Sequence, residues 1–128
     1  MVKQLRILST VLLAFAVGQA GLGAGIIDEI KPLKIAHATN AFAVLVLTIL
    51  SAVFGYAVRR SGGPAWTFFL PLALVVMAGV QLTLGFAEIR GFHVFWGVLY
   101  LCTVTTFCSY SWRLRPTTES AQPATTTP

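Results

Sequence analysis

Charged residues are scarce in this chain of 128 residues, which has nine basic and four acidic side chains. A soluble domain normally carries about a quarter charged residues, so the composition argues against a soluble protein. The few charges also cluster and leave four long stretches without any charge. Each stretch reaches the length of about 20 residues that an α-helix needs to cross a bilayer. The sequence therefore predicts an all-α bundle of four transmembrane helices, over about 7–27, 35–58, 65–87 and 91–112.

Cysteine is scarce as well, with Cys102 and Cys108 as the only two. Both fall in the last charge-free stretch and form no CxxC, so we expect buried free thiols rather than a redox pair. The chain also lacks a Ser/His/Asp set, a glycine-rich phosphate loop and paired carboxylates within the charge-free stretches. Nothing therefore indicates hydrolysis or phosphoryl transfer. Once the helices are in lipid no soluble basic face remains, which argues against nucleic acid as a partner.

The basic residues are distributed unevenly over the two sides of the predicted spans. Six flank one side and three flank the other, and the side with more lysine and arginine normally faces the cytoplasm. We therefore expect a multi-pass protein of a bacterial inner membrane with both termini cytoplasmic. The six are Lys3, Arg6, Arg59, Arg60, Arg113 and Arg115, and the three are Lys31, Lys34 and Arg90.

The two ends of the chain need separate interpretation. Residues 1–20 resemble a secretory signal that ends in a small-residue cleavage site. The apolar run continues to Ile27, however, so we expect this segment to be retained as the first helix. At the other end, 116–128 is rich in Thr and Pro and has too little apolar content to fold. The expected organisation is one transmembrane domain over 1–115 and a disordered cytoplasmic tail over 116–128.

A short pattern occurs twice in the chain. QAGLG at 19–23 and QLTLG at 81–85 each lie near the end of an apolar run. Each is followed by a short charged loop and then by the only histidine of its half, His37 or His93. Lys34 and Arg90 lie three residues before these histidines. The pattern predicts two helix-hairpin repeats, about 7–58 and 65–112.

Helical spacing from each histidine gives a stripe of small and polar residues, which in a membrane normally faces the interior of the bundle. From His37 the stripe contains Asn40, Ala41, Val44, Thr48, Ser51 and Gly55. From His93 it contains Gly97, Tyr100, Val104, Phe107 and Ser111.

The paired histidines are the strongest indication of function. The helices over 35–58 and 91–112 run in the same direction, so His37 and His93 lie at nearly the same depth. If both stripes face inward, the two imidazoles can hold one haem iron axially. Lys34 and Arg90 lie one turn further out on the same faces, where haem propionates need cations. The sequence thus predicts a haem b site, with His37 and His93 as metal ligands.

Simpler interpretations of the same residues stay open. A histidine at a membrane interface is often a tolerated amphipathic residue, and a basic residue at a helix end often sets orientation only. Gln19 and Gln81 lie deep enough to need partners, so they either contact the cofactor or hydrogen-bond to each other. Glycines near Gln19 either allow close helix packing or make room for a flat ligand. Two histidines alone make a poor zinc site, and copper lacks a nearby Met or Cys.

The two motifs and their histidines resemble one four-helix half of the heme A synthase family. That family has two four-helix halves, with haem-ligating histidines on the second and fourth helix of each, and the resemblance covers about residues 7–112. It implies that His37 and His93 are axial ligands. The family has a glutamate three residues before the first histidine of its catalytic half, and the corresponding residue here is Lys34. The external cysteine pair of many members is also absent. The resemblance therefore implies haem binding rather than synthase activity.

Three functional hypotheses follow. The first is a small cytochrome b-like protein that transfers electrons or holds haem for a respiratory or haem-handling membrane protein. The second is a cofactor-free accessory or assembly subunit of a membrane complex. The third is a homodimer that rebuilds an eight-helix arrangement.

Overall fold

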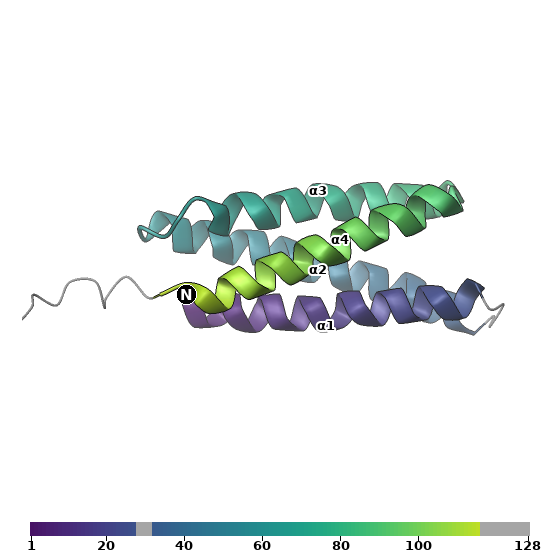
Figure 1. Ribbon diagram of the computed structural model, residues 1–128, viewed down its shortest axis with the longest axis horizontal. Helices are drawn as coiled ribbons and strands as arrows, with labels where there is room; N and C mark the ends of the chain where they lie inside the picture. Colours follow the sequence, from purple (N-terminus) through teal and green to yellow (C-terminus); the bar gives the residue numbers. More distant parts are fainter. Residues whose placement is uncertain (28–31, 116–128) are drawn as a thin grey trace, which may run out of the picture.

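The computed structural model describes residues 1–27 and 32–115, which form four α-helices (Figure 1). All four are long and apolar enough to cross a membrane, which confirms the predicted fold class. The first helix begins earlier than expected, because its first two turns include Lys3 and Arg6. Residues 28–31 of the predicted loop at 28–34 and the predicted tail at 116–128 lie outside the described residues. The helices are α1 (Val2–Ile27), α2 (Leu33–Arg60), α3 (Trp66–Phe86) and α4 (Arg90–Arg113).

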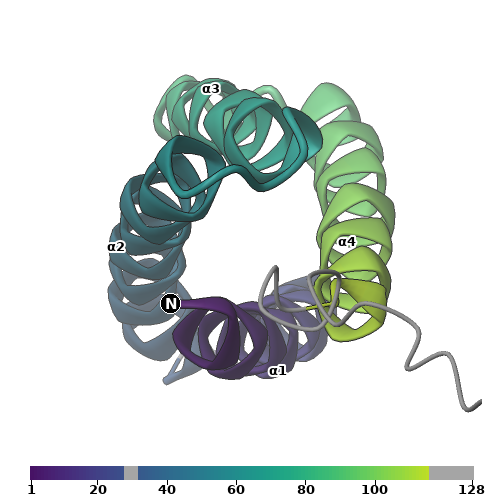
Figure 2. The same ribbon diagram turned by 90° about the vertical axis from the view of Figure 1, so that its left-hand side faces the viewer.

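The four helices form a closed ring around one central axis (Figure 2). Each helix packs against the two that flank it, and α2 lies diagonally opposite α4. Both diagonal helices run in the same direction along the bundle. The ring therefore places the two histidine-bearing helices so that they face each other across the axis.

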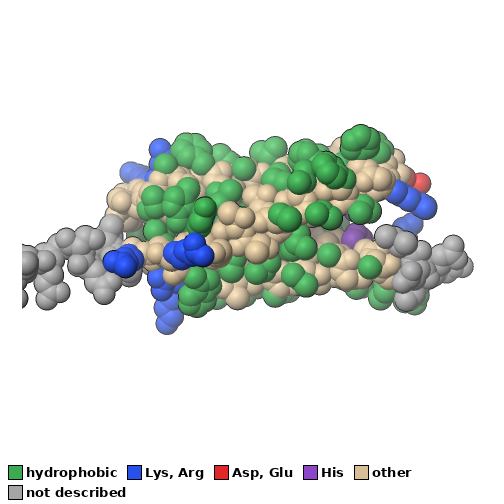
Figure 3. All heavy atoms as spheres, viewed as in Figure 1, with side chains coloured by type: hydrophobic (Ala, Val, Ile, Leu, Met, Phe, Trp, Pro, Cys, Tyr) green, Lys and Arg blue, Asp and Glu red, His purple; other side chains and the backbone are tan. Residues whose placement is uncertain are grey.

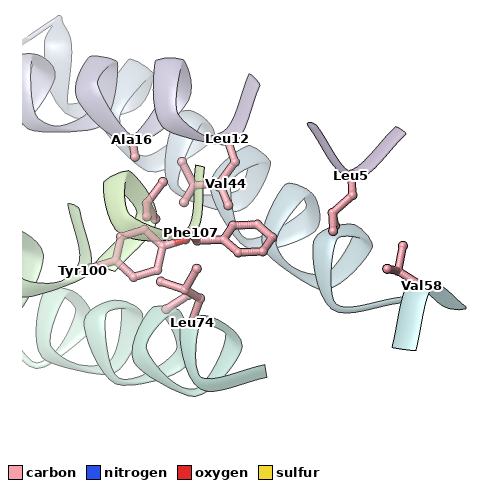
Figure 4. Packing of buried hydrophobic residues seen from close by; sticks show 10 residues of the cluster. Leu5, Leu12, Ala16, Val44, Val58, Leu74, Tyr100 and Phe107 are labelled. Carbon is pink, nitrogen blue, oxygen red and sulfur yellow. The ribbon is translucent and has the colours of Figure 1, made fainter. Parts of the chain in front are cut away.

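Apolar side chains from all four helices fill the centre of the ring. Phe107 of α4 is fully buried and lies among Leu12 of α1, Val44 of α2 and Leu74 of α3 (Figure 4). Many large apolar side chains also point outward, such as Phe42, which is 54% exposed (Figure 3). An outer surface this apolar is expected in lipid rather than in water.

The two predicted stripes do face the interior. In both helices the residues near the histidine are partly buried, and those further along are buried. The buried members are Val44, Thr48, Ser51 and Gly55 in α2, and Tyr100, Val104, Phe107 and Ser111 in α4. The expectation for the cysteines was half wrong, because Cys108 is buried but Cys102 is exposed on the outer face of α4.

One hydrogen bond joins the diagonal helices near the middle of the bundle. The Thr48 hydroxyl donates to the carbonyl oxygen of Val44 at 2.7 Å and also lies within hydrogen-bond distance of the Tyr100 hydroxyl. A threonine hydroxyl has one proton to donate, so Tyr100 is the donor in the second bond. Tyr100 lies two turns beyond His93 on α4. This bond therefore lies within the apolar core, two turns from the histidine pair.

A close crossing of α2 and α3 sits near the other end of the ring. Gly55 packs against the backbone of Thr67 and the ring of Pro71, and all three residues are buried. Pro71 lies inside α3, one turn after its start. The second helix ends at Arg60, and Gly62 in the connection to α3 has a φ of +89°, which favours glycine.

Candidate functional site

The structure brings His37 and His93 together at one end of the ring (Figure 3). Their ring centroids are 6.1 Å apart and the ring planes are inclined by 59°. Each histidine lies in the first turns of its helix, α2 or α4, and each is partly buried. The expected approach of the two imidazoles across the bundle is thus confirmed. We call this end of the bundle the histidine end.

The His93 ring is held by a single residue of α3. Its Nδ1 lies 3.1 Å from the carbonyl oxygen of Gln81, and its Nε2 lies 3.2 Å from Gln81 Nε2. A carbonyl oxygen only accepts, so Nδ1 carries the proton and donates it there. Nε2 is then unprotonated and accepts from the Gln81 amide. The Gln81 carbonyl therefore fixes the tautomer of His93. Nδ1 carries the proton, and the lone pair of Nε2 points away from that carbonyl.

The His37 ring is held less firmly. Its Nδ1 is buried and has no hydrogen-bond partner among the described residues. Its backbone is better fixed, because Gln19 Nε2 donates to the His37 carbonyl oxygen at 3.0 Å. Asn40 Nδ2 in turn donates to Gln19 Oε1 at 2.7 Å. The two histidines are therefore unequal: α3 orients the ring of one, whereas α1 orients only the backbone of the other.

Glycine makes room for each imidazole. A Cβ atom at Gly23 would lie 3.3 Å from Cε1 of His37, and a Cβ atom at Gly85 would lie 3.1 Å from Cε1 of His93. These glycines are the last residues of QAGLG and QLTLG. A Cβ at Gly18 or Gly21 would meet nothing within 4 Å. Of these three α1 glycines, only Gly23 would crowd a histidine ring if it had a side chain, and the repeated motif is the signal that identifies it.

A second pair of matched contacts lies one turn deeper. Asn40, three residues after His37, donates from Nδ2 to the carbonyl oxygen of Phe15 at 3.0 Å. Trp96, three residues after His93, donates from Nε1 to the carbonyl oxygen of Met77 at 2.9 Å. Each acceptor lies four residues before the glutamine of its half. The sequence had placed Asn40 only on an interior stripe, so its role beside the histidine was missed.

The glutamines do not pair with each other in the hydrogen bonds of the described residues. Gln19 bonds to α2, and Gln81 bonds to α4. The expectation of a Gln19–Gln81 bond was therefore wrong. Each glutamine is close in sequence to the helix that follows its own. The short connection places that next helix beside the glutamine, so the amide bonds to it. Gln81 Oε1 is buried without a partner among the described residues.

Lys34 and Arg90 lie in the first turns of α2 and α4, and both are exposed. Each is three residues before a histidine, so it lies on the same helix face and nearer to the end of the bundle. With one exposed cation beside each imidazole, the histidine end can receive an anionic group at its rim.

A metal held by protein ligands alone lacks a ligand set here. Over 1–27 and 32–115 no group of three or more His, Cys, Asp or Glu side chains gathers in one place. Two imidazoles suffice only when another molecule fills the remaining coordination positions, as a porphyrin does. Comparison with protein families, with characterised proteins and with solved structures found no match for this chain.

Proposed function

We propose that this chain is a small multi-pass protein of a bacterial inner membrane that binds one haem b between α2 and α4. His37 and His93 would hold its iron, and both termini are cytoplasmic in this proposal. The observation that carries it is the 6.1 Å separation of the two ring centroids. Metal–imidazole bonds are about 2 Å long, so two imidazoles that share one metal ion have centroids up to about 6 Å apart, and this pair would fit that limit.

The environment of His93 supports its role as a ligand. A ligating histidine normally donates its second ring N–H to a carbonyl or carboxylate, which fixes the tautomer and raises the basicity of the ligating nitrogen. The bond from His93 Nδ1 to the Gln81 carbonyl has this form and leaves Nε2 for iron. The Gln81 side-chain amide, which now donates to Nε2, would have to turn away for this nitrogen to serve as a ligand. Its Oε1 has no present partner among the described residues, so the rotation breaks no bond of that oxygen.

The cations complete the proposed site. Haem propionates are anionic and favour the edge of the bilayer, where Lys34 and Arg90 lie exposed. Bound haem would supply one-electron chemistry. The chain would then transfer electrons, or hold haem for a respiratory or haem-handling membrane protein. In this proposal the bundle is similar to one half of a heme A synthase in its ligand arrangement, without the synthase reaction.

The absorption spectrum of the purified protein tests the proposal. In mild detergent we expect a Soret band and split visible bands on reduction, with about one haem per chain. His37→Ala and His93→Ala should each lose most of the haem. Lys34→Gln and Arg90→Gln are the matched controls, because they remove an exposed charge worth about 0–1 kcal/mol and leave both ligands in place. Full haem content and an unchanged reduced spectrum in both alanine variants would rule out ligation by this pair.

One observation favours a second candidate function. Both ring nitrogens of His93 already have partners on Gln81, as in a purely structural polar cluster. A cofactor-free accessory or assembly subunit would need no more than this. Such a protein is colourless after purification, even when haem is supplied during expression. It also copurifies in a fixed ratio with another membrane protein, so the same preparation distinguishes the two candidates.

A further inference from the structure

The end of the bundle opposite the histidines is strongly basic. It carries the side chains of Lys3, Arg6, Arg59, Arg60, Arg113 and Arg115, and we call it the basic end (Figure 3). Glu88, the one acidic residue within the described parts of the chain, lies at the histidine end. The charge at the basic end is therefore not neutralised by any described carboxylate.

Three of these cations are already engaged within the bundle. Arg6 donates from Nη2 to the carbonyl oxygen of Leu114 at 2.6 Å and thereby satisfies a carbonyl just beyond the end of α4. Arg59 lies over the ring of Phe69, with 4.5 Å from its guanidinium carbon to the ring centroid. Arg60 lies 5.9 Å from the ring centroid of Tyr56. These contacts hold Arg6 against the end of α4, Arg59 against α3 and Arg60 against its own helix, α2.

The other three cations line two cavities instead. One cavity of about 340 Å³ lies between the start of α3 and the end of α4 and contains Arg113 and Arg115 in its wall. The other, also about 340 Å³, lies between the start of α1 and the connection from α2 to α3, and contains Lys3 and Arg115. Arg115 thus belongs to both. Lys3, Arg113 and Arg115 make no hydrogen bond or cation–π contact with another described residue.

We propose that these cavities form a binding site for the phosphate group of an anionic phospholipid, with Arg113 and Arg115 as its principal ligands. A guanidinium binds phosphate oxygens through two parallel hydrogen bonds, which suits two arginines with free donors. Basic pockets between transmembrane helices are a recurrent form of headgroup site. This proposal is independent of haem binding at the histidine end.

The surroundings of the first cavity favour a lipid over free phosphate. Trp66 and Tyr110 line it, with ring centroids 5.7 Å apart, and such side chains concentrate at the level of lipid headgroups. Tyr110 is 46% exposed and faces the apolar outer surface along α4. The helix α4 also packs less closely against α1 and α3 than α2 does. An acyl chain therefore has an apolar path beside the headgroup site.

Native mass spectrometry of the full chain in detergent tests the site, with phosphatidylglycerol and phosphatidylcholine of identical acyl chains as probes. We expect the first phosphatidylglycerol to bind at least tenfold more tightly than phosphatidylcholine. Each basic residue near a headgroup contributes roughly fivefold, so the double variant Arg113→Gln, Arg115→Gln should lose most of this preference. The matched control is Arg59→Gln, Arg60→Gln, which removes the same charge from the same end but not from a cavity wall. This control variant should keep a preference for phosphatidylglycerol within about threefold of the wild-type preference.

Each other result overturns the proposal. Equal affinity for the two lipids in the wild type would exclude an anionic site. Equal losses in the two double variants would assign the preference to the overall charge of the basic end. Displacement of phosphatidylglycerol by excess inorganic phosphate would identify a free anion as the ligand. If the double variant does not fold, the single variant Arg115→Gln replaces it, because Arg115 lies beyond α4. This single variant should bind phosphatidylglycerol roughly fivefold more weakly than the wild type.

Discussion

The close crossing of α2 and α3 at Gly55 predicts that one added methyl group there lowers the stability of the bundle strongly. At Gly55 a Cβ atom would overlap the carbonyl oxygen of Thr67 and lie 3.2 Å from Cγ of Pro71. A side chain could rotate away from such a contact, but a backbone carbonyl within a helix cannot. Gly55→Ala therefore requires α2 and α3 to move apart over their crossing.

The magnitude follows from two contributions. Overpacking of a close-packed interior costs about 1–3 kcal/mol, and a rigid backbone neighbour puts this site in the upper part of that range. Separation of the helices also lengthens the contact from the Thr67 hydroxyl to the Gly55 carbonyl oxygen, now 3.2 Å. The one proton of this hydroxyl is shared with the Pro64 carbonyl oxygen at 2.8 Å, so the loss is at most the roughly 0.6 kcal/mol of a hydrogen bond between membrane helices. We expect the free energy of unfolding to fall by about 3 kcal/mol, a large part of the 5–15 kcal/mol typical of a domain.

The assay is titration of the purified protein with sodium dodecyl sulfate, followed by circular dichroism and tryptophan fluorescence. The matched control is Gly79→Ala, because a Cβ at Gly79 on α3 would meet nothing within 4 Å. Helix propensity alone predicts that this control is neutral or more stable by up to about 1 kcal/mol. If Gly55→Ala unfolds at the same detergent fraction as Gly79→Ala, the inferred close crossing of α2 and α3 is refuted.

Further predictions concern the other contacts of the bundle. Thr48→Val should leave the buried Tyr100 hydroxyl without its acceptor and lower the free energy of unfolding by about 1–2 kcal/mol, whereas adding Tyr100→Phe should recover part of that loss in the same titration. Gly85→Leu should displace the His93 ring, so haem per chain should fall well below that of Gly79→Leu in spectra of the two purified variants. Reporter fusions after Pro128 and within 28–34 should report opposite sides of the membrane, and the same side for both would contradict four spans.

The two halves of the predicted internal repeat make several matched contacts. Gly23 and Gly85 each approach the imidazole of their own half, and Asn40 and Trp96 each donate to an equivalent carbonyl. The halves also differ, because the His93 ring bonds to the Gln81 carbonyl whereas His37 Nδ1 has no partner in the described chain. The repeat remains a prediction, and His37→Ala compared with His93→Ala measures how far the halves differ in function.

The sequence by itself determined the four helices and their inward faces. A bilayer leaves backbone groups no partner except those of the same helix, so charge-free stretches of sufficient length have to be helical. Helical spacing then decides which side chains share a face, and the stripes from His37 and His93 are buried as expected. The meeting of the two histidines was also predictable, because parallel helices with equal offsets hold them at one depth.

Only the tertiary structure decided which groups touch within that frame. Whether Gln81 bonds to Gln19 or to His93 depends on the rotation of each helix about its axis, and local sequence leaves that rotation to the packing of the whole ring. Packing of the whole ring also decides that Gly23 and Gly55 lie in close contact with a neighbouring helix, whereas Gly18 does not. Glycine permits a close contact, but the neighbouring helix has to supply it. The cavities beside Arg115 likewise form between segments that are distant in the sequence, which no single helix encodes.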